Sequence, residues 1–326
     1  SNLSPSSTMR FPIYIIDAFT STRFNGNAAA VFLSKEEHEC SQMLRIAAEF
    51  NLSETAFPVP LNSEESFETA RAFSLRYFSP KVEVPLCGHA TLSAAHVLFN
   101  EIGNAHNELE FHTKGGVVTV ARDAKGVRMN FPVHAPKHVH LEGIHNERKE
   151  LFEECESVDS ASISKLIHSF IPSEISIISV ALAADTPMLI IEIDPATTKQ
   201  QLRSINPDFA EMIRIHSAAD VFGIATVTVA PLDPTGQGFV SEEGTPFDYA
   251  SRVFAPWIGI NEDPATGASH CSLGPYCSAV LGKEEMNAFQ CFPNRGAQFK
   301  VSVGQNERRV DIVGSSVTVV RGEVEL

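Results

Sequence analysis

Apolar residues along the chain gather in short runs separated by polar turn residues, a pattern that predicts many strands and few helices. The strand-like runs are rich in β-branched residues and cover 13–17, 29–33, 55–59, 72–78, 117–121 and 127–131, and later 175–181, 188–193, 224–230, 299–303 and 317–320. Helical spacing is clearest over 35–50, 90–101, 163–170 and 269–281. Because the strands outnumber the helices, the pattern favours an α+β fold over a doubly wound parallel sheet.

One motif occurs once in each half of the chain. Arg76-Tyr-Phe-Ser-Pro80 precedes VEVPLCGHATLSAAHVLF, and Arg252-Val-Phe-Ala-Pro256 precedes IGINEDPATGASHCSLGPYCSAVL. Both stretches contain R-x-F-x-P, a short strand, a Gly-containing turn and a helix rich in Ala and Ser. One copy in each half suggests a duplicated lobe rather than a short-period repeat array.

A length of 326 residues suits two domains of roughly 150 residues each. We expect one lobe over residues 1–130 with a returning strand at 311–326, and a second lobe over 131–310. The connection between them is expected near 131–137, where the sequence FPVHAPK contains two prolines.

The net charge narrows the range of partners. The chain has 25 Lys and Arg against 40 Asp and Glu, a net charge of −15, which repels nucleic acid and anionic membranes. A site with local positive charge can still bind a small anion. The apolar stretches are too short for a membrane span or secretory signal, and the six cysteines lack paired spacing, so we expect a cytoplasmic protein with reduced thiols.

The helix that follows each motif begins with small residues, at Gly88 and at Gly267. Small residues let backbone N–H groups approach a ligand, and a helix N-terminus carries partial positive charge. If the two lobes face one another, both helix starts converge on one cleft and form a receptor for a carboxylate.

Three polar residues near these turns have two interpretations each. Glu54 opens an apolar strand and is either a solvated loop carboxylate or a proton-transfer group. His89 is either a polar residue of a first helical turn or a donor to a carboxylate. Asp263, followed by Pro264, has the pattern of a helix N-cap, a role that can coexist with ligand contact.

Common cofactor and hydrolase signatures do not occur in the sequence. It contains no GxGxxG after a strand, no GxxxxGK[ST], no HExxH and no GxSxG. The histidines and cysteines at Cys87, His89, His96, His270 and Cys271 do not have the spacing of a standard zinc site. No cofactor and no metal are therefore expected.

Several stretches together resemble the PhzF-like (phenazine biosynthesis-like) isomerase family, relatives of diaminopimelate epimerase. The matching stretches are YIIDAFTSTRFNGNAAAVFL, NLSETAF, RYFSPKVEVPLCGHATLSAAHVLF and FDYASRVFAPWIGINEDPATGASHCSLGPY, with a weaker match at NRGAQFKV. They span most of residues 13–303. The resemblance implies two pseudo-symmetric lobes, each an antiparallel barrel-like sheet around a central helix, with the last strand returning to the first lobe.

The resemblance also implies roles for individual residues. Glu54 matches the general acid/base of the family, and His89 and Asp263 match positions that hold the substrate. The neighbouring motif residues that complete the expected substrate-binding set are Gly88, Gly267, Ala268, Ser269 and Asn27. The implied activity is a cofactor-independent isomerisation of a small carboxylated metabolite by proton transfer in the cleft between the lobes, with a homodimer as the assembly considered.

The sequence also departs from the family pattern. The usual Thr-Gly-Ser-Ala-His is Thr266-Gly-Ala-Ser-His270 here, which moves a hydroxyl one position, or about 100° around a helix. This predicts a substrate other than the phenazine precursor. Cys87 matches one of the two cysteines of the epimerase relatives, but Pro264 stands in place of the other, so a two-thiol racemase is not expected. The alternatives left open are a lyase, an epimerase or a pericyclic-type enzyme on the same scaffold, or a non-catalytic small-molecule binding protein.

Overall fold

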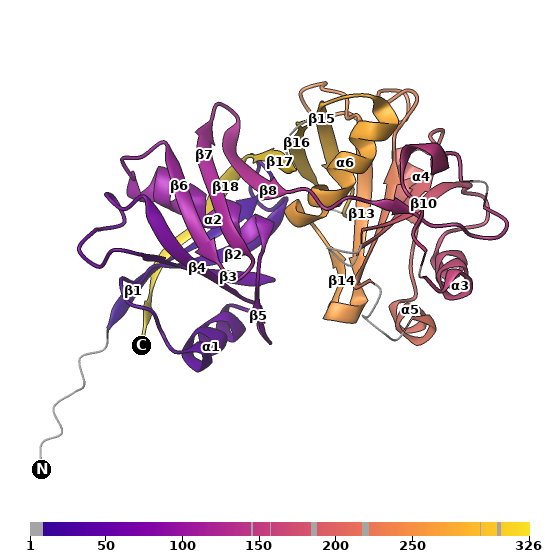
Figure 1. Cartoon of the computed structure of the whole chain (residues 1–326). Coiled ribbons are helices and arrows are strands. Elements are labelled where there is room, and N and C mark those ends of the chain that lie inside the picture. Colours follow the sequence, from indigo (N-terminus) through magenta and orange to yellow (C-terminus); the bar gives the residue numbers. More distant parts are fainter. Residues whose placement is uncertain are drawn as a thin grey trace, which may run out of the picture. The chain divides into compact units, whose positions relative to one another are not determined.

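The computed structural model describes residues 9–144, 146–156, 158–183, 188–216, 222–293, 295–304 and 308–326. The chain forms two compact units, one of residues up to Met129 together with Gly314–Leu326, and the other Asn130–Val313. In Figure 1 the final strand, drawn in yellow, lies among the indigo and magenta strands of the first unit. No helix among the described residues is both long enough and apolar enough to cross a membrane.

The first unit is a sheet around one buried helix. Its strands are β1 (Arg10–Ala18), β2 (Asn27–Phe32), β3 (Glu54–Pro60), β4 (Ala72–Phe78), β5 (Glu83–Val84), β6 (Glu108–Thr113), β7 (Gly116–Asp123), the start of β8 (Gly126–Pro132), and β18 (Ser316–Glu325). Its helices are α1 (Cys40–Phe50) and α2 (Gly88–His96), the latter extended by a π-helical turn, η1 (Val97–Ile102). The strands β18, β1, β2, β3, β4, β6 and β7 are neighbours in that order, and β5 pairs with β4.

The second unit has the same order of strands. Its strands are β9 (Lys137–His138), β10 (Ile177–Ala183), β11 (Met188–Ile193), β12 (Ile224–Val229), β13 (Tyr249–Ala255), β14 (Ile260–Asp263), β15 (Glu285–Gln290), β16 (Ala297–Val303) and β17 (Arg309–Gly314). Its helices are α3 (Ser160–Phe170), α4 (Lys199–Ser204), α5 (Phe209–Ile215) and α6 (His270–Leu281), with short 3₁₀ turns η2 (Lys149–Leu151), η3 (Pro256–Ile258) and η4 (Gly267–Ser269). The neighbours run from β9 through β10, β11, β12, β13, β15 and β16 to β17, with β14 paired to β13.

The expected mixture of many strands with few helices is confirmed, but the sheets are mixed rather than purely antiparallel. In the first unit β2 pairs with β3, and β4 with β6, in parallel. The second unit repeats this with β11 and β12 and with β13 and β15. Parallel neighbours need a crossover connection, and in each case the connecting chain contains a helix, so the expectation of antiparallel sheets is wrong for these pairs.

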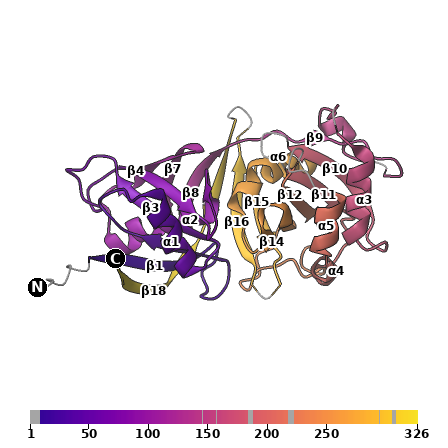
Figure 2. The ribbon, with the colours of Figure 1, turned by 90° about the horizontal axis from the view of Figure 1, so that it is seen from below.

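Helix α2 is the centre of the first unit. All nine of its residues are buried, and it packs against β1, β2, β3 and β18; Figures 1 and 2 both show it against these strands. Its side chains are mostly Ala, Ser, Thr and Gly, which allow strands to approach from several sides. Because α2 is buried on all sides, it is not divided into an apolar and a solvent-exposed polar face. Helix α1, in contrast, is amphipathic.

The repeated R-x-F motif holds the short strand before each central helix. Arg76 donates two hydrogen bonds to Glu83 of β5, each of 2.8 Å, and Arg252 donates two to Glu262 of β14, each of 2.7 Å. Each guanidinium also lies over the ring of the motif phenylalanine, at 5.2 Å in the first unit and 4.9 Å in the second. Bidentate, charge-assisted pairs of this kind fix orientation, so the motif positions the segment from which each central helix begins.

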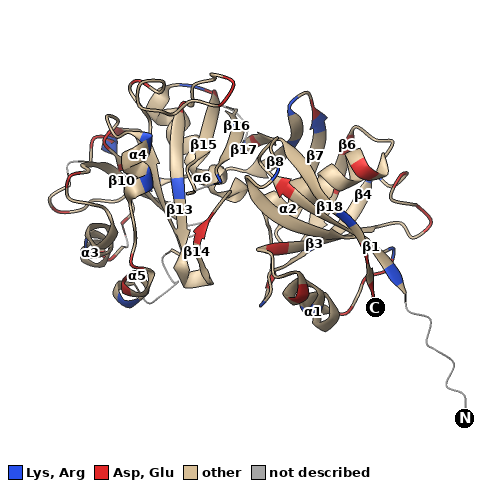
Figure 3. Cartoon of the chain, turned by 180° about the vertical axis from the view of Figure 1, so that it is seen from behind, with Lys and Arg blue, Asp and Glu red and all other residues tan. Residues whose placement is uncertain are grey.

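Charged side chains are dispersed over both units. Figure 3 shows basic positions scattered among more numerous acidic ones.

Candidate active site

Five polar side chains of the first unit meet where helix α2 begins. They come from the start of β2 and β3 and from the turn into the helix: Asn27, Ser53, Glu54, Cys87 and His89. The parallel pairing of β2 with β3 places the beginnings of both strands at the same edge of the sheet. Cys87 is extended, with φ −144° and ψ 116°, and Gly88 begins the helix behind it. Residues that are far apart in sequence therefore share one buried cluster.

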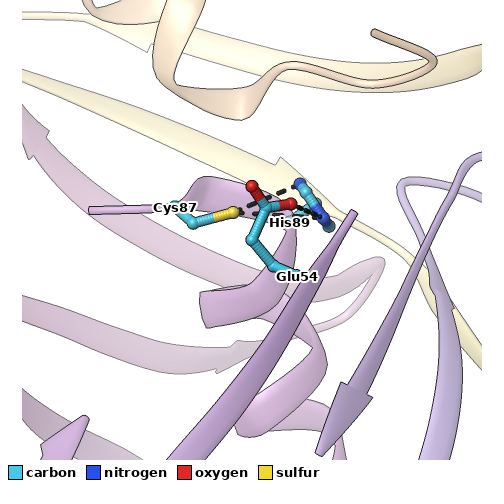
Figure 4. A group of neighbouring side chains, drawn as sticks. All are labelled: Glu54, Cys87 and His89. Carbon is cyan, nitrogen blue, oxygen red and sulfur yellow. Dashed lines mark hydrogen bonds and ion pairs between the residues drawn. The ribbon is translucent and has the colours of Figure 1, made fainter. Parts of the chain in front are cut away.

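Glu54 is buried, with 6% of its surface exposed, so the interpretation as a solvated loop carboxylate is wrong. Its Oε2 lies 3.0 Å from His89 Nε2, an ion-pair distance drawn in Figure 4. Burial raises the pKa of the carboxyl, but the charge of His89 and hydrogen bonds from His89, Ser53 and Cys87 outweigh it, so the pKa is lowered. Glu54 is therefore ionised at neutral pH and can accept a proton.

The His89 ring lies between several partners. Its Nε2 is 3.0 Å from both Glu54 Oε2 and Ser53 Oγ, and its Nδ1 is 3.3 Å from both Cys87 Sγ and Asn27 Nδ2. Burial lowers the pKa of the imidazole, but hydrogen bonds with Cys87 and Glu54, together with the charge of Glu54, raise it well above its ordinary value. The ring is therefore an imidazolium held against a carboxylate.

Cys87 contributes a protonated thiol. It is 8% exposed, and burial together with the nearby charge of Glu54 raises its pKa, in spite of the opposing effect of His89. Ser53 supports the ring, because its Oγ lies 3.0 Å from His89 Nε2 and can accept a hydrogen bond from it. The Ser53 hydroxyl in turn donates to Asn27 Oδ1 at 3.2 Å.

Three of these side chains could also ligate a metal ion. One donor atom from each of Glu54, Cys87 and His89 lies within 4.8 Å of the others, a spacing that an ion can bridge. These atoms already pair with one another, and the raised pKa of both the thiol and the imidazole means that an ion must displace two protons to bind.

The second unit holds the other predicted residues, and there one interpretation is wrong. Asp263 is not a helix cap, because it ends strand β14, paired with Val253, and helix α6 starts only at His270. The ladder with β13 keeps the backbone of Asp263 extended, so the helix cannot begin there. Its Oδ2 instead accepts a 2.6 Å hydrogen bond from the Thr266 hydroxyl.

The turn that follows Asp263 is fixed by a buried glutamine. Gln290 Nε2 donates to the Asp263 carbonyl at 2.6 Å, and Gln290 Oε1 accepts from Thr266 N–H at 2.7 Å. Gly267, Ala268 and Ser269 form η4. The Ser269 hydroxyl is buried and donates to the Thr266 carbonyl at 2.8 Å, so it supports the turn and does not replace the hydroxyl missing at Ala268.

The predicted site residues thus fall into two groups. Asn27, Glu54, Gly88 and His89 meet in the first unit, and Asp263, Gly267, Ala268 and Ser269 share one turn of the second. The prediction missed the supporting residues Ser53, Thr266 and Gln290. The only sequence signal for Ser53 is its place beside Glu54 in NLSETAF. A serine just before a strand is ordinarily interpreted as a turn residue.

Comparison with known proteins agrees with these motifs. The family description "Phenazine biosynthesis-like protein" matches residues 16–322. A phenazine biosynthesis-like domain-containing protein of Mus musculus is 36% identical, covering 96% of this chain and 99% of its own. A protein of Halalkalibacterium halodurans described as an uncharacterized isomerase is 33% identical, covering 98% of this chain and all of its own.

Solved structures give the same result for the fold. A PhzF-family protein of Enterococcus faecalis superposes with a TM-score of 0.76 at 29% identity, covering 98% of this chain and all of its own. A predicted epimerase of Pseudomonas aeruginosa, at 20% identity and a TM-score of 0.62, shares the fold. The chain belongs to the phenazine biosynthesis-like family, whose relatives include proteins described as isomerases.

Proposed function

We propose that this protein is a cofactor-independent isomerase that relocates a proton on a small carboxylated metabolite. The observation that carries the proposal is Glu54, an ionised and buried carboxylate held 3.0 Å from the ring of the His89 imidazolium. Such a group can take a proton from a carbon acidified by a neighbouring carbonyl or carboxylate and return it at another carbon.

The surroundings of Glu54 suit an anionic substrate. His89 supplies a positive charge, and the start of helix α2 has no side-chain cap. Its first-turn N–H groups and the helix dipole would stabilise negative charge as it develops on the substrate. Substrate binding by these groups, with Asn27 and Gly88 beside them, is part of the proposal.

A comparison of strand registers favours one acid/base cluster over two. Thr55 of β3 lies opposite Phe78, and Ala225 of β12 lies opposite Phe254, the corresponding motif phenylalanine. Ile224 therefore takes the place of Glu54 in the second unit. A racemase needs groups on both faces of the reacting carbon, whereas a proton shift along one face needs one cluster.

We further propose that Asp263 and the turn Gly267–Ser269 bind substrate. The support is the family motif at these positions and the rigidity that Gln290 gives the turn. Because Ala268 has no hydroxyl and that of Ser269 is used internally, we expect poor turnover of the phenazine precursor. A lost hydrogen bond to a polar substrate group typically costs about 1–3 kcal/mol.

The test is isotope uptake across a panel of candidate substrates. Purified protein is incubated in heavy water with a set of small unsaturated and cyclic carboxylic acids, and mass spectrometry records isomers and deuterium uptake. Glu54→Gln keeps the size of the side chain but cannot accept the proton, so conversion should fall about 10²–10⁴-fold. Glu64→Gln, at an exposed loop position, is the matched control. Undiminished conversion by Glu54→Gln would remove Glu54 from the reaction.

A further inference from the structure

We propose that Cys87 is a second proton carrier of this site, coupled to Glu54 through the ring of His89. Glu54 would remove a proton from one substrate carbon, and the Cys87 thiol would deliver one to another. This inference rests on the proposed function and deepens it, because it assigns the two halves of the proton shift to two different side chains.

The geometry that carries the inference is the position of the imidazole. Nε2 faces Glu54 Oε2 at 3.0 Å, and Nδ1 faces Cys87 Sγ at 3.3 Å, while the distance from Sγ to Nε2 is 3.9 Å. Nδ1 is thus the ring nitrogen nearer to Cys87 and Nε2 the one beside Glu54, although Figure 4 shows contacts from the sulfur to both nitrogens. The carboxylate and thiol donor atoms lie within 4.8 Å of one another, which lets both reach one face of a small substrate.

The resting protonation states are opposite in the way that this division requires. The pKa of the Glu54 carboxyl is lowered, so it begins as the base, and the pKa of the Cys87 thiol is raised, so it begins as the acid. Environments that shift the pKa values of two neighbouring groups in opposite directions are typical of acid/base pairs. A thiol buried only for packing needs no such partners.

The proton balance closes over one turnover. The substrate C–H bond breaks as the Glu54 O–H bond forms, and the electron pair moves along the substrate to the second carbon. That carbon takes the Cys87 proton, leaving a thiolate. His89 then gives its Nδ1 proton to Cys87. After the product leaves, Nδ1 takes a proton from water and Glu54 releases its proton to water, which restores the starting state with one proton exchanged with solvent.

Other groups near Cys87 do not compete for this role. Tyr77 of β4 has a pKa raised by burial, and its hydroxyl lies 2.6 Å from Thr91 Oγ1, so it stays neutral. The Cys87 carbonyl accepts a 2.7 Å hydrogen bond from the Thr91 hydroxyl, which fixes the backbone that carries the thiol. Among the described residues whose charges act on Cys87, this leaves Glu54 and His89.

The first measurement needs no substrate. In a protein with Cys40→Ser and Cys155→Ser, which removes the thiols outside the core, the Cys87 thiol is titrated by ultraviolet difference against the same protein with Cys87→Ala. Glu54→Gln should lower its apparent pKa by removing a like charge, and His89→Gln should raise it by removing the cation. The Cys271 thiol, buried in α6, should respond to neither change. A Cys87 titration unaffected by both variants would overturn the coupling.

The second measurement uses the acid that gives Glu54-dependent deuterium uptake. Cys87→Ser should lower kcat about 10²-fold or more with little change in KM, and its residual activity should lose the alkaline limb of the pH profile that the thiol provides. Cys271→Ser should keep that limb. Full turnover by Cys87→Ser, with turnover lost in Glu54→Gln, would overturn the relay and leave the isomerase intact. Full turnover by Glu54→Gln would overturn both.

Discussion

The start of helix α2 in the first unit and the start of helix α6 in the second occupy the same place in the repeated strand order, but they differ in chemistry. At α2 an ionised Glu54, a protonated His89 and a Cys87 thiol contact one another. Before α6 a network of neutral hydrogen bonds from Gln290 holds a turn, and Ile224 replaces the acid. Duplication of the scaffold has therefore not duplicated the acid/base cluster.

Two buried histidines make the same contrast at a single residue. His89 and His270 are 4% and 0% exposed, yet burial lowers the pKa of His270 to about 3, whereas the pKa of His89 is raised. His270 Nδ1 lies 2.7 Å from the Tyr249 hydroxyl, and Nε2 has no partner among the described residues. Both imidazoles are buried to a similar extent, so the neighbouring Glu54 carboxylate, and not the degree of burial, accounts for the positive charge of His89.

The largest expected effect comes from removing the positive charge at α2. His89→Gln leaves Glu54 buried without its counter-charge, so the pKa of the carboxyl rises and less of the base is ionised. We expect a fall in kcat/KM of about 10²-fold or more, with the acidic limb of the pH profile moved to higher pH. The measurement is the pH–rate profile of the isotope-uptake reaction. If the acidic limb does not move, the charge of His89 does not affect the ionisation of Glu54, and the prediction is wrong.

A second prediction concerns stability and the other histidine. Because the pKa of His270 is about 3 in the folded protein and 6.5 ordinarily, the unfolded chain binds its proton first as the pH falls. This group therefore lowers stability between pH 6.5 and about 3, by up to about 1.4 kcal/mol per pH unit. His270→Gln should flatten that slope in denaturant unfolding followed against pH. An unchanged slope would mean that His270 finds a charge partner in the fold.

A third and smaller effect is expected at the turn of the second unit. Gln290→Ala leaves the Asp263 carbonyl and Thr266 N–H without their buried partner, which typically costs about 1–3 kcal/mol. Under the proposed function KM should rise more than kcat falls, since the turn binds and does not transfer protons. Asn287→Ala, in the same strand, is the control. A loss confined to kcat would place the turn in the chemical step.

The sequence predicted the kind of each element better than the number of elements or their ends. Helix 35–50 was expected, but α1 begins at Cys40, because Ser34 Oγ bonds locally to Glu36 and favours a turn. The short helices α4 and α5 were missed, since they span only six and seven residues. Within the candidate site, the position of Glu54 at a strand opening was correct. Its charge was not predictable from pattern alone, because it depends on His89, a tertiary neighbour.

The smallest expected effect is that of chelation, and it tests whether the α2 cluster is an acid/base group throughout. Its donor atoms contact one another, and two of the three hold protons, so an ion would have to displace protons from both Cys87 and His89. Exhaustive dialysis against a chelator should leave isotope uptake unchanged within error. Added Zn²⁺ should inhibit if it binds at all, since it would occupy the Glu54 carboxylate. Activity that falls on dialysis and returns with a divalent cation would contradict this prediction and would make the first unit a metal centre.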